Sequence, residues 1–213
     1  MPAHGGDRKT VDKRRTILDA AISVFASRGF HSCRVSDVAE QAGVAYGLVY
    51  HYFDSKEEIL NTLFSERWQI MLTAIDEIDA REDLPARAKL QEVASFIIES
   101  YRHEPDLMKV IIVEVTRAAN SFGRQHLDQI GDAYAKLAVI IESARDDGSF
   151  KRAISPALAA MFFYGAIEQV LTGWIFDFLP ATDDEFERAK SLVVETICGG
   201  LEAAPAAGAP ISG

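Results

Sequence analysis

The segment from Phe30 to Glu58 places the strongest constraint on how this chain folds. Apolar residues spaced for one face of a short helix precede Gly43, a residue that adopts positive φ at little cost. A second short apolar set, which includes Val49 and Phe53, follows it directly. Two short helices joined by such a turn form a helix-turn-helix, whose second helix fits the DNA major groove. The residues expected on its outer side are Ala45, Tyr46, Gly47, Leu48, Tyr50 and His51.

The residues after this motif predict the start of a long helix. Ser55 can cap the N-terminus of a helix that begins at Lys56, and Glu58 can reach back to complete a capping box. At the earlier helix start, Cys33 replaces a better capping residue, which predicts a poorly capped first short helix.

A long ordered pattern surrounds the motif. Its features are Ile17-Leu18-Asp19-Ala20-Ala21, Gly29-Phe30, Val38-Ala39-Glu40-Gln41-Ala42-Gly43-Val44, Gly47, Tyr50-His51-Tyr52-Phe53 and Ser55-Lys56-Glu57. From about Arg14 to Phe64, this pattern resembles the DNA-binding end of the TetR family of transcriptional repressors. The resemblance implies a dimer that binds double-stranded DNA at a palindromic operator.

The same resemblance assigns roles to individual residues. The start of the second short helix would enter the groove, so the expected base-facing residues are Ala45, Tyr46, Gly47 and Leu48. Tyr46 stands where the family often has Lys. Arg34 stands where Thr or Ser is common and can still reach a phosphate. The positions that match phosphate contacts are Tyr50, His51, Tyr52 and Lys56; a core role is the alternative for Tyr52 and is favoured for Phe53. Because base-edge donors are few, we expect modest base readout and strong reliance on phosphates.

The net charge of −10 at first argues against a nucleic-acid partner. The charge is uneven, however: residues 1–56 hold eight Lys or Arg and six Asp or Glu, while residues 57–213 hold fourteen and twenty-six. Residues 1–56 (the head) thus have a net charge of +2, and residues 57–213 (the body) have a net charge of −12. This distribution fits a small DNA-binding module attached to an acidic domain, although a net charge of +2 alone is no basic patch.

Three features of the sequence limit which other classes of protein this chain could belong to. Cys33 and Cys198 are far apart, which predicts neither a zinc site nor a disulfide framework. The N-terminus lacks a signal-peptide pattern, and the apolar run 157–167 is too short to span a bilayer. We therefore expect a soluble cytoplasmic protein without a membrane partner. Residues 1–8 and 204–213 are expected to be disordered.

Helical periodicity dominates the rest of the chain and predicts an all-α fold. We expect a three-helix DNA-binding domain at 9–56 and a helical effector-binding and dimerisation domain at 57–203. The predicted helix 158–178 is apolar nearly all round, and such a helix must be covered on every side. A second copy of the chain is the expected cover. In TetR-like proteins, the last two long helices form a four-helix dimer interface.

The body is also expected to bind an effector. The candidate lining residues are Phe96, Tyr101, Met108, Ile112, Val115, Tyr134, Phe163, Ile167 and Trp174. Glu114, Arg117 and Glu168 lie in apolar stretches and could orient a ligand or pair with each other. Parts of the body are similar to TetR-type regulators of fatty-acid degradation, which implies long-chain acyl-CoA or another hydrophobic effector, with CoA phosphates near Arg117 and Arg124. Plain bundle core is the alternative for each apolar position.

Two other classes stay open. An enzyme on a helix bundle is disfavoured, because the residues three before His31, His51, His103 and His126 are not acidic, as a di-iron bundle needs. No phosphate-binding glycine loop occurs either, so we expect no enzymatic activity, no cofactor and no metal. A helical scaffold that binds only protein is the second alternative, and gel filtration would separate it from a dimer.

Overall fold

The structure, a computed structural model, describes residues 5–116, 126–151, 153 and 155–201, and these ranges contain helices and no β-strand. The all-α prediction is confirmed. Contacts between Cα atoms divide the chain into two compact units, residues 1–71 with 99–129 and residues 72–98 with 130–213. The units interleave along the chain because α6 returns to pack on α1. The domain limits expected from the sequence, 9–56 and 57–203, stay a prediction.

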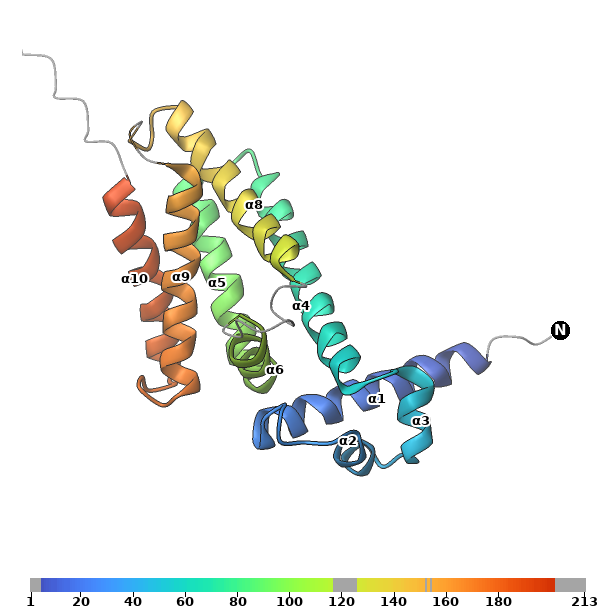
Figure 1. Cartoon of the computed structure of the whole chain (residues 1–213). Coiled ribbons are helices and arrows are strands. Elements are labelled where there is room, and N and C mark those ends of the chain that lie inside the picture. Colours follow the sequence, from blue (N-terminus) through green and yellow to red (C-terminus); the bar gives the residue numbers. More distant parts are fainter. Residues whose placement is uncertain (1–4, 117–125, 152, 154, 202–213) are drawn as a thin grey trace, which may run out of the picture. The chain divides into compact units, whose positions relative to one another are not determined.

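The first unit contains the helix-turn-helix. Its elements are α1 (Gly5–Arg28), α2 (Val35–Ala42), α3 (Tyr46–Tyr52), the first part of α4 (Lys56–Asp79), α6 (Pro105–Val110) and the π-helix η1 (Ile111–Thr116). α2 packs on both α1 and α3 (Figure 1). The core of this unit contains Phe25, Val38, Val49, Phe53 and Phe64, which are all nearly inaccessible to solvent.

Two glycines end helices as the sequence predicts. Gly29 follows α1 with φ of 80°, and Gly43 follows α2 with φ of 63°. After α2, the Val44 N–H donates to the Ala39 carbonyl over 3.0 Å and the Gly43 N–H to Glu40 over 3.1 Å. Both bonds close within the left-handed turn, so two of the terminal carbonyls of α2 are satisfied and the chain turns directly into α3.

Two helix starts differ from the sequence expectation. α1 begins at Gly5, so residues 5–8, which we expected to be disordered, are helical. Residues 5–16 carry no apolar stripe. No periodic signal therefore marked a helix there, since helix propensity alone produces none. α2 is capped from within, because the Asp37 carboxylate accepts the Arg34 N–H over 2.7 Å. Arg34, rather than Cys33, is the N-cap residue, and this bond satisfies its backbone N–H.

The start of α4 follows the prediction closely. The Ser55 hydroxyl accepts the Glu58 N–H over 3.1 Å, as a capping residue should. The Glu58 carboxylate reaches back to the Asp54 N–H, one residue earlier than in the expected box. Both bonds fix the point at which the chain leaves α3 and enters the long helix.

The second unit is a helical bundle. It contains the end of α4, most of α5 (Ala86–His103), most of α8 (Leu127–Asp146), α9 (Pro156–Ile175) and α10 (Asp183–Leu201). α9 and α10 run side by side (Figure 1), and the rings of Trp174 and Phe186 meet with centroids 4.6 Å apart. Tyr134 of α8 and Tyr164 of α9 make an edge contact at 5.5 Å. Ser155 caps α9, and Pro156 occupies its first turn, as predicted.

α9 is twenty residues long, longer than the apolar run 157–167 on which the bilayer argument was based. By length and composition it could cross a membrane, with a mean hydropathy of 1.3 over its most apolar window. Half of that window is buried inside the protein, as in the core helix of a bundle. The helix stops at Ile175 rather than Phe178, because Asp177 has φ of 56° and the Gly173 carbonyl accepts both following N–H groups, from Phe178 and Leu179.

Candidate nucleic-acid interface

α3 presents a polar and aromatic face to solvent. Val49 and Phe53 are buried and anchor the helix, while the exposed residues at its start and along its outer side are Ala45, Tyr46, Gly47, Tyr50 and His51. Leu48, expected on the outer side, is half-buried, and so is Tyr52. The space where a Gly47 side chain would lie is open, so another molecule can approach the backbone there.

Tyr46 and Tyr50 form a pair on this face. Their rings make an edge contact with centroids 5.1 Å apart, and a hydrogen bond of 3.2 Å joins the two hydroxyls. The side chains remain 54% and 43% exposed. The hydrogen bond with Tyr46 is the main cause that raises the pKa of the Tyr50 hydroxyl. The Tyr50 phenol therefore stays neutral at physiological pH.

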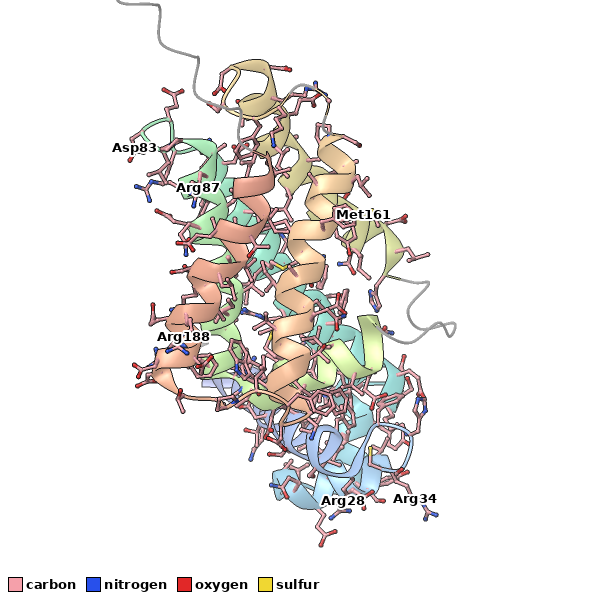
Figure 2. All side chains as sticks on the ribbon, turned by 90° about the vertical axis from the view of Figure 1, so that its left-hand side faces the viewer. Arg28, Arg34, Asp83, Arg87, Met161 and Arg188 are labelled. Atoms are coloured by element: carbon pink, nitrogen blue, oxygen red, sulfur yellow. The ribbon has the colours of Figure 1, made fainter. Side chains whose placement is uncertain are left out.

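Arg34 is exposed at the N-terminus of α2, where a phosphate contact was predicted. Figure 2 shows Arg34 and Arg28 at the surface of the first unit. Asp37 bonds to the Arg34 backbone and also pairs with the Arg28 guanidinium over 2.9 Å. The start of α2 is thus held in place by one carboxylate with two partners.

Lys56 is already engaged within the protein. Its ammonium donates to the carbonyls of Phe30 and Cys33, the latter over 3.0 Å, and lies 4.4 Å from the centre of the Phe30 ring. These contacts connect the start of α4 to the loop 29–34 that leads into α2. A phosphate contact by Lys56 stays a prediction, and the ammonium would have to share its donors to make one.

Other cations of the first unit are also neutralised. Arg14 pairs with Glu66 over 2.9 Å and lies 5.4 Å from the centre of the Phe53 ring. Arg15 pairs with Asp19 over 2.8 Å. The positive charge available to a phosphate backbone is therefore smaller than the count of basic residues suggests. Neutral hydrogen-bond donors would then make a larger share of the contacts with DNA phosphates.

The proposed effector-lining residues fall in both units. Tyr101, Met108 and Ile112 are buried in the first unit. The candidates in the second unit are Phe96, Tyr134, Phe163, Ile167 and Trp174, of which all but the half-buried Phe96 and Tyr134 are buried. The Val115 side chain, Arg117 and Arg124 lie outside the described residues. Their shared role as a cavity lining stays a prediction.

Glu114, which the sequence analysis named as a possible ligand-orienting group, contacts the loop before α2; a role toward a ligand stays a prediction. Its carboxylate accepts the Phe30 N–H over 3.3 Å and lies 3.8 Å from Nε2 of His31, while its side chain is 14% exposed. The π-helix η1 therefore contacts the same loop 29–34 that Lys56 holds. No sequence motif indicates this contact, because the two partners are 84 residues apart.

His126 is another residue whose role the sequence left open. It is buried against Phe64 with ring centroids 4.1 Å apart, and its two ring nitrogens lie 2.9 Å from side-chain oxygens of Asn61 and Gln129. These contacts are structural. Within the described ranges, no group of three His, Cys, Asp or Glu side chains could hold a metal ion.

The fold and the exposed face of α3 define a helix-turn-helix DNA-binding protein. Residues 17–63 match the model of bacterial regulatory proteins of the tetR family, and residues 64–182 match the model of the C-terminal region of YsiA-like protein. The chain therefore belongs to the TetR family and is a DNA-binding transcriptional regulator.

Individual relatives agree with this assignment. The fatty acid metabolism regulator protein of Bacillus subtilis (strain 168) is 33% identical over 78% of this chain and 84% of that protein. The transcriptional repressor KstR2 of Rhodococcus jostii (strain RHA1) is 28% identical over 76% of this chain and 79% of that protein. The crystal structure of FadR from Bacillus subtilis in complex with stearoyl-CoA has a TM-score of 0.78 at 28% identity, covering 87% of this chain and 98% of that chain.

Proposed function

We propose that this regulator is a ligand-released repressor that acts in the cytoplasm and binds a palindromic operator as a homodimer. The observation that carries the proposal is the outer face of α3, where Tyr46, Tyr50 and His51 flank the open backbone of Gly47. Two such heads on a twofold axis would contact half-sites about one helical turn apart. Because relatives of this chain are transcriptional regulators, no enzymatic step is assigned to it.

The DNA-binding part can be tested by selecting duplexes from a random-sequence pool with the purified protein. We expect an enriched palindrome, and we expect the fragment upstream of the protein's own coding region to bind with salt-dependent affinity. If no sequence is enriched, the proposed binding to a specific operator is wrong. If the affinity does not change with salt concentration, the predicted phosphate contacts are wrong.

Exposed apolar residues support dimerisation through α9 and α10. Leu158, Met161 and Phe162 of α9 are 50%, 52% and 61% exposed, and Leu192 of α10 is 59% exposed. Met161 is labelled on α9 in Figure 2. Beside them, a groove of about 380 Å³ runs between the start of α9 and the end of α10. Covering this apolar surface with a second copy would remove it from water.

The effector we propose is a long-chain acyl-CoA. The support is the relative named as a fatty acid metabolism regulator and the FadR structure that holds stearoyl-CoA. Fully buried apolar residues of the second unit, Phe163 and Ile167 among them, suit an acyl chain. Arg117 and Arg124 remain our proposed partners for the CoA phosphates.

A thermal-shift assay with stearoyl-CoA, free stearate and CoA separately tests this assignment. We expect stearoyl-CoA to raise the unfolding temperature most and to lower operator affinity in a parallel mobility-shift assay. If free stearate alone stabilises the protein, the effector is a free fatty acid rather than an acyl-CoA thioester. If none of the three changes either readout at saturation, the lipid effector is excluded.

The contacts of Glu114 suggest how the effector could act on DNA binding. A shift of η1 would move the Glu114 carboxylate, and with it the loop 29–34 that positions the start of α2. α4 provides a second connection through Lys56. An effector that favours one arrangement of these contacts would thereby change the geometry of the head.

A further inference from the structure

The turn that joins α9 to α10 displays a cluster of apolar side chains to solvent. Phe176, Phe178 and Leu179 are 45%, 78% and 41% exposed, and residues 176–179 are called the aromatic turn below. The Phe178 value is the highest for a large apolar side chain in the part of the chain that the structure describes. The rings of Phe176 and Phe178 stack with centroids 6.2 Å apart, so they present one apolar surface. Such a gathered patch is typical of an interaction site.

The backbone holds the aromatic turn in one shape. The Gly173 carbonyl accepts the N–H groups of Phe178 and Leu179 over 2.7 and 3.1 Å. Asp177 has φ of 56°, a conformation that is uncommon for a residue other than glycine. Leu179 packs directly on α9, since a Cβ at Gly173 would lie 2.6 Å from its Cδ1. A constrained turn that leaves two phenyl rings in water is better explained by binding than by the stability of the chain itself.

The charges around the aromatic turn limit what it can bind. Residues 175–187 contain five Asp or Glu and no Lys or Arg. Three of these carboxylates, on Asp177, Asp183 and Asp184, belong to exposed residues. An acidic rim repels the phosphates of nucleic acid and of anionic lipid headgroups. The apolar surface therefore fits another protein rather than either of those.

The aromatic turn also continues the exposed face of α9. Phe176 follows Leu158 by eighteen residues, which is five helical turns, and Phe162 by fourteen, which is close to four. All three thus lie on one side, together with the exposed Gln169 and with Gly165, where the space for a side chain is open. In Figure 2, the ribbons of α9 and α10 are the outer layer of the second unit on the side that faces the viewer.

We propose that the aromatic turn packs against a second copy of this chain and forms one end of the dimer interface. This inference rests on the homodimer proposed above and adds to it a segment outside the two helices. A partner that covers the face of α9 from Leu158 to Phe162 and continues along the same side reaches Phe176 and the ring stacked on it. Because the interface is twofold, each dimer would bury two aromatic turns.

The first test compares Phe178→Ser with Val139→Ser in the full-length protein by sedimentation equilibrium. Val139 is the matched control, because it is 54% exposed on α8, away from the proposed interface. We expect Phe178→Ser to raise the dissociation constant of the dimer about tenfold or more, since two buried phenyl rings are lost. Val139→Ser should dimerise like the wild type. Circular dichroism verifies that both variants keep their helical content.

A second test reports contact even if the dimer is too tight for a dissociation constant. Phe178 is replaced by p-benzoylphenylalanine, a phenylalanine analogue that forms a covalent bond to nearby C–H groups on illumination. We expect a covalent dimer on a denaturing gel, with mass spectrometry locating the bond in residues of the partner. The same analogue at position 139 should give no covalent dimer.

The inference is overturned if Phe178→Ser dimerises like the wild type, or if the analogue at position 178 reacts only within its own chain. A wild-type protein that sediments as a monomer would instead remove the proposed homodimer, and the inference with it. That outcome is distinct because it appears before any variant is made.

Discussion

Gly43 and Gly47 are four residues apart and have opposite backbone requirements. Gly43 has φ of 63°, while Gly47 lies within α3, and an added Cβ would meet no atom within 4 Å at either position. We expect Gly43→Ala to lower the free energy of unfolding by about 1–2 kcal/mol, the cost of left-handed backbone. Gly47→Ala should raise it by about 0.5–1 kcal/mol, because alanine favours the helix. Urea unfolding measures both.

The same pair separates stability from recognition. If DNA approaches the backbone at Gly47, Gly47→Ala should weaken operator binding although the protein becomes more stable. Wild-type affinity in Gly47→Ala would show that no close approach occurs there. A loss of stability in both variants would contradict the assignment of Gly47 to a regular helix.

Lys56 tests a predicted phosphate contact against an observed internal one. Lys56→Ala removes the bonds to Phe30 and Cys33, so it should cost about 1–3 kcal/mol of stability and weaken binding to all duplexes alike. A salt titration then decides the mechanism: a direct phosphate contact lowers the slope by about one. Leu48→Ala should instead change sequence preference. If both variants alter affinity and preference in the same way, the two assigned roles are wrong.

The pKa of Tyr50 gives a prediction with a defined sign. The bond with Tyr46 raises this pKa above its ordinary value of 10.0, so the neutral hydroxyl persists to higher pH in the native protein. In Tyr46→Phe the pKa should fall back, and Tyr50 should ionise at lower pH than in wild type. Carbon-13 NMR of labelled tyrosine follows the titration. An identical titration in both proteins would show that the hydroxyls do not interact in solution.

At the scale of elements, the loop 29–34 is held from two sides, by Lys56 at the start of α4 and by Glu114 of η1. We expect Glu114→Ala to retain operator binding while reducing release by stearoyl-CoA, because it removes the contact between η1 and the loop. Glu114→Gln keeps an acceptor for the Phe30 N–H and should show a smaller defect. Mobility shifts with and without the acyl-CoA measure both. Full release in Glu114→Ala would exclude this route.

Helix positions were largely predictable because their signals are local. Gly29, Gly43, Ser55 and Pro156 mark helix ends through backbone conformation or capping, which depends on neighbours a few residues away. The early start of α1 lacked an apolar stripe. The π-helical register of η1 was also not predictable, since its sequence Ile-Ile-Val-Glu-Val-Thr fits an ordinary buried helix equally well.

For the whole molecule, the exposed apolar face of α9 predicts the oligomeric state. Phe162→Glu would place a charge in the proposed dimer interface, so we expect a monomer in gel filtration with light scattering and a large loss of operator affinity. Val139→Glu is the matched control, because Val139 is 54% exposed on α8, outside that face. A dimer that survives Phe162→Glu would move the interface elsewhere.

The sequence by itself determined the all-α class, the helix-turn-helix, its caps and the family, because these depend on periodicity and on short motifs. It also identified which residues of α3 face outward, with the exception of the half-buried Leu48. Only the tertiary structure decided which polar groups are already bound. The Tyr46 hydroxyl, the Lys56 ammonium and the Glu114 carboxylate each have a partner within the protein. The partners of Lys56 and Glu114 are remote in sequence, so their contacts exist only once the chain has folded.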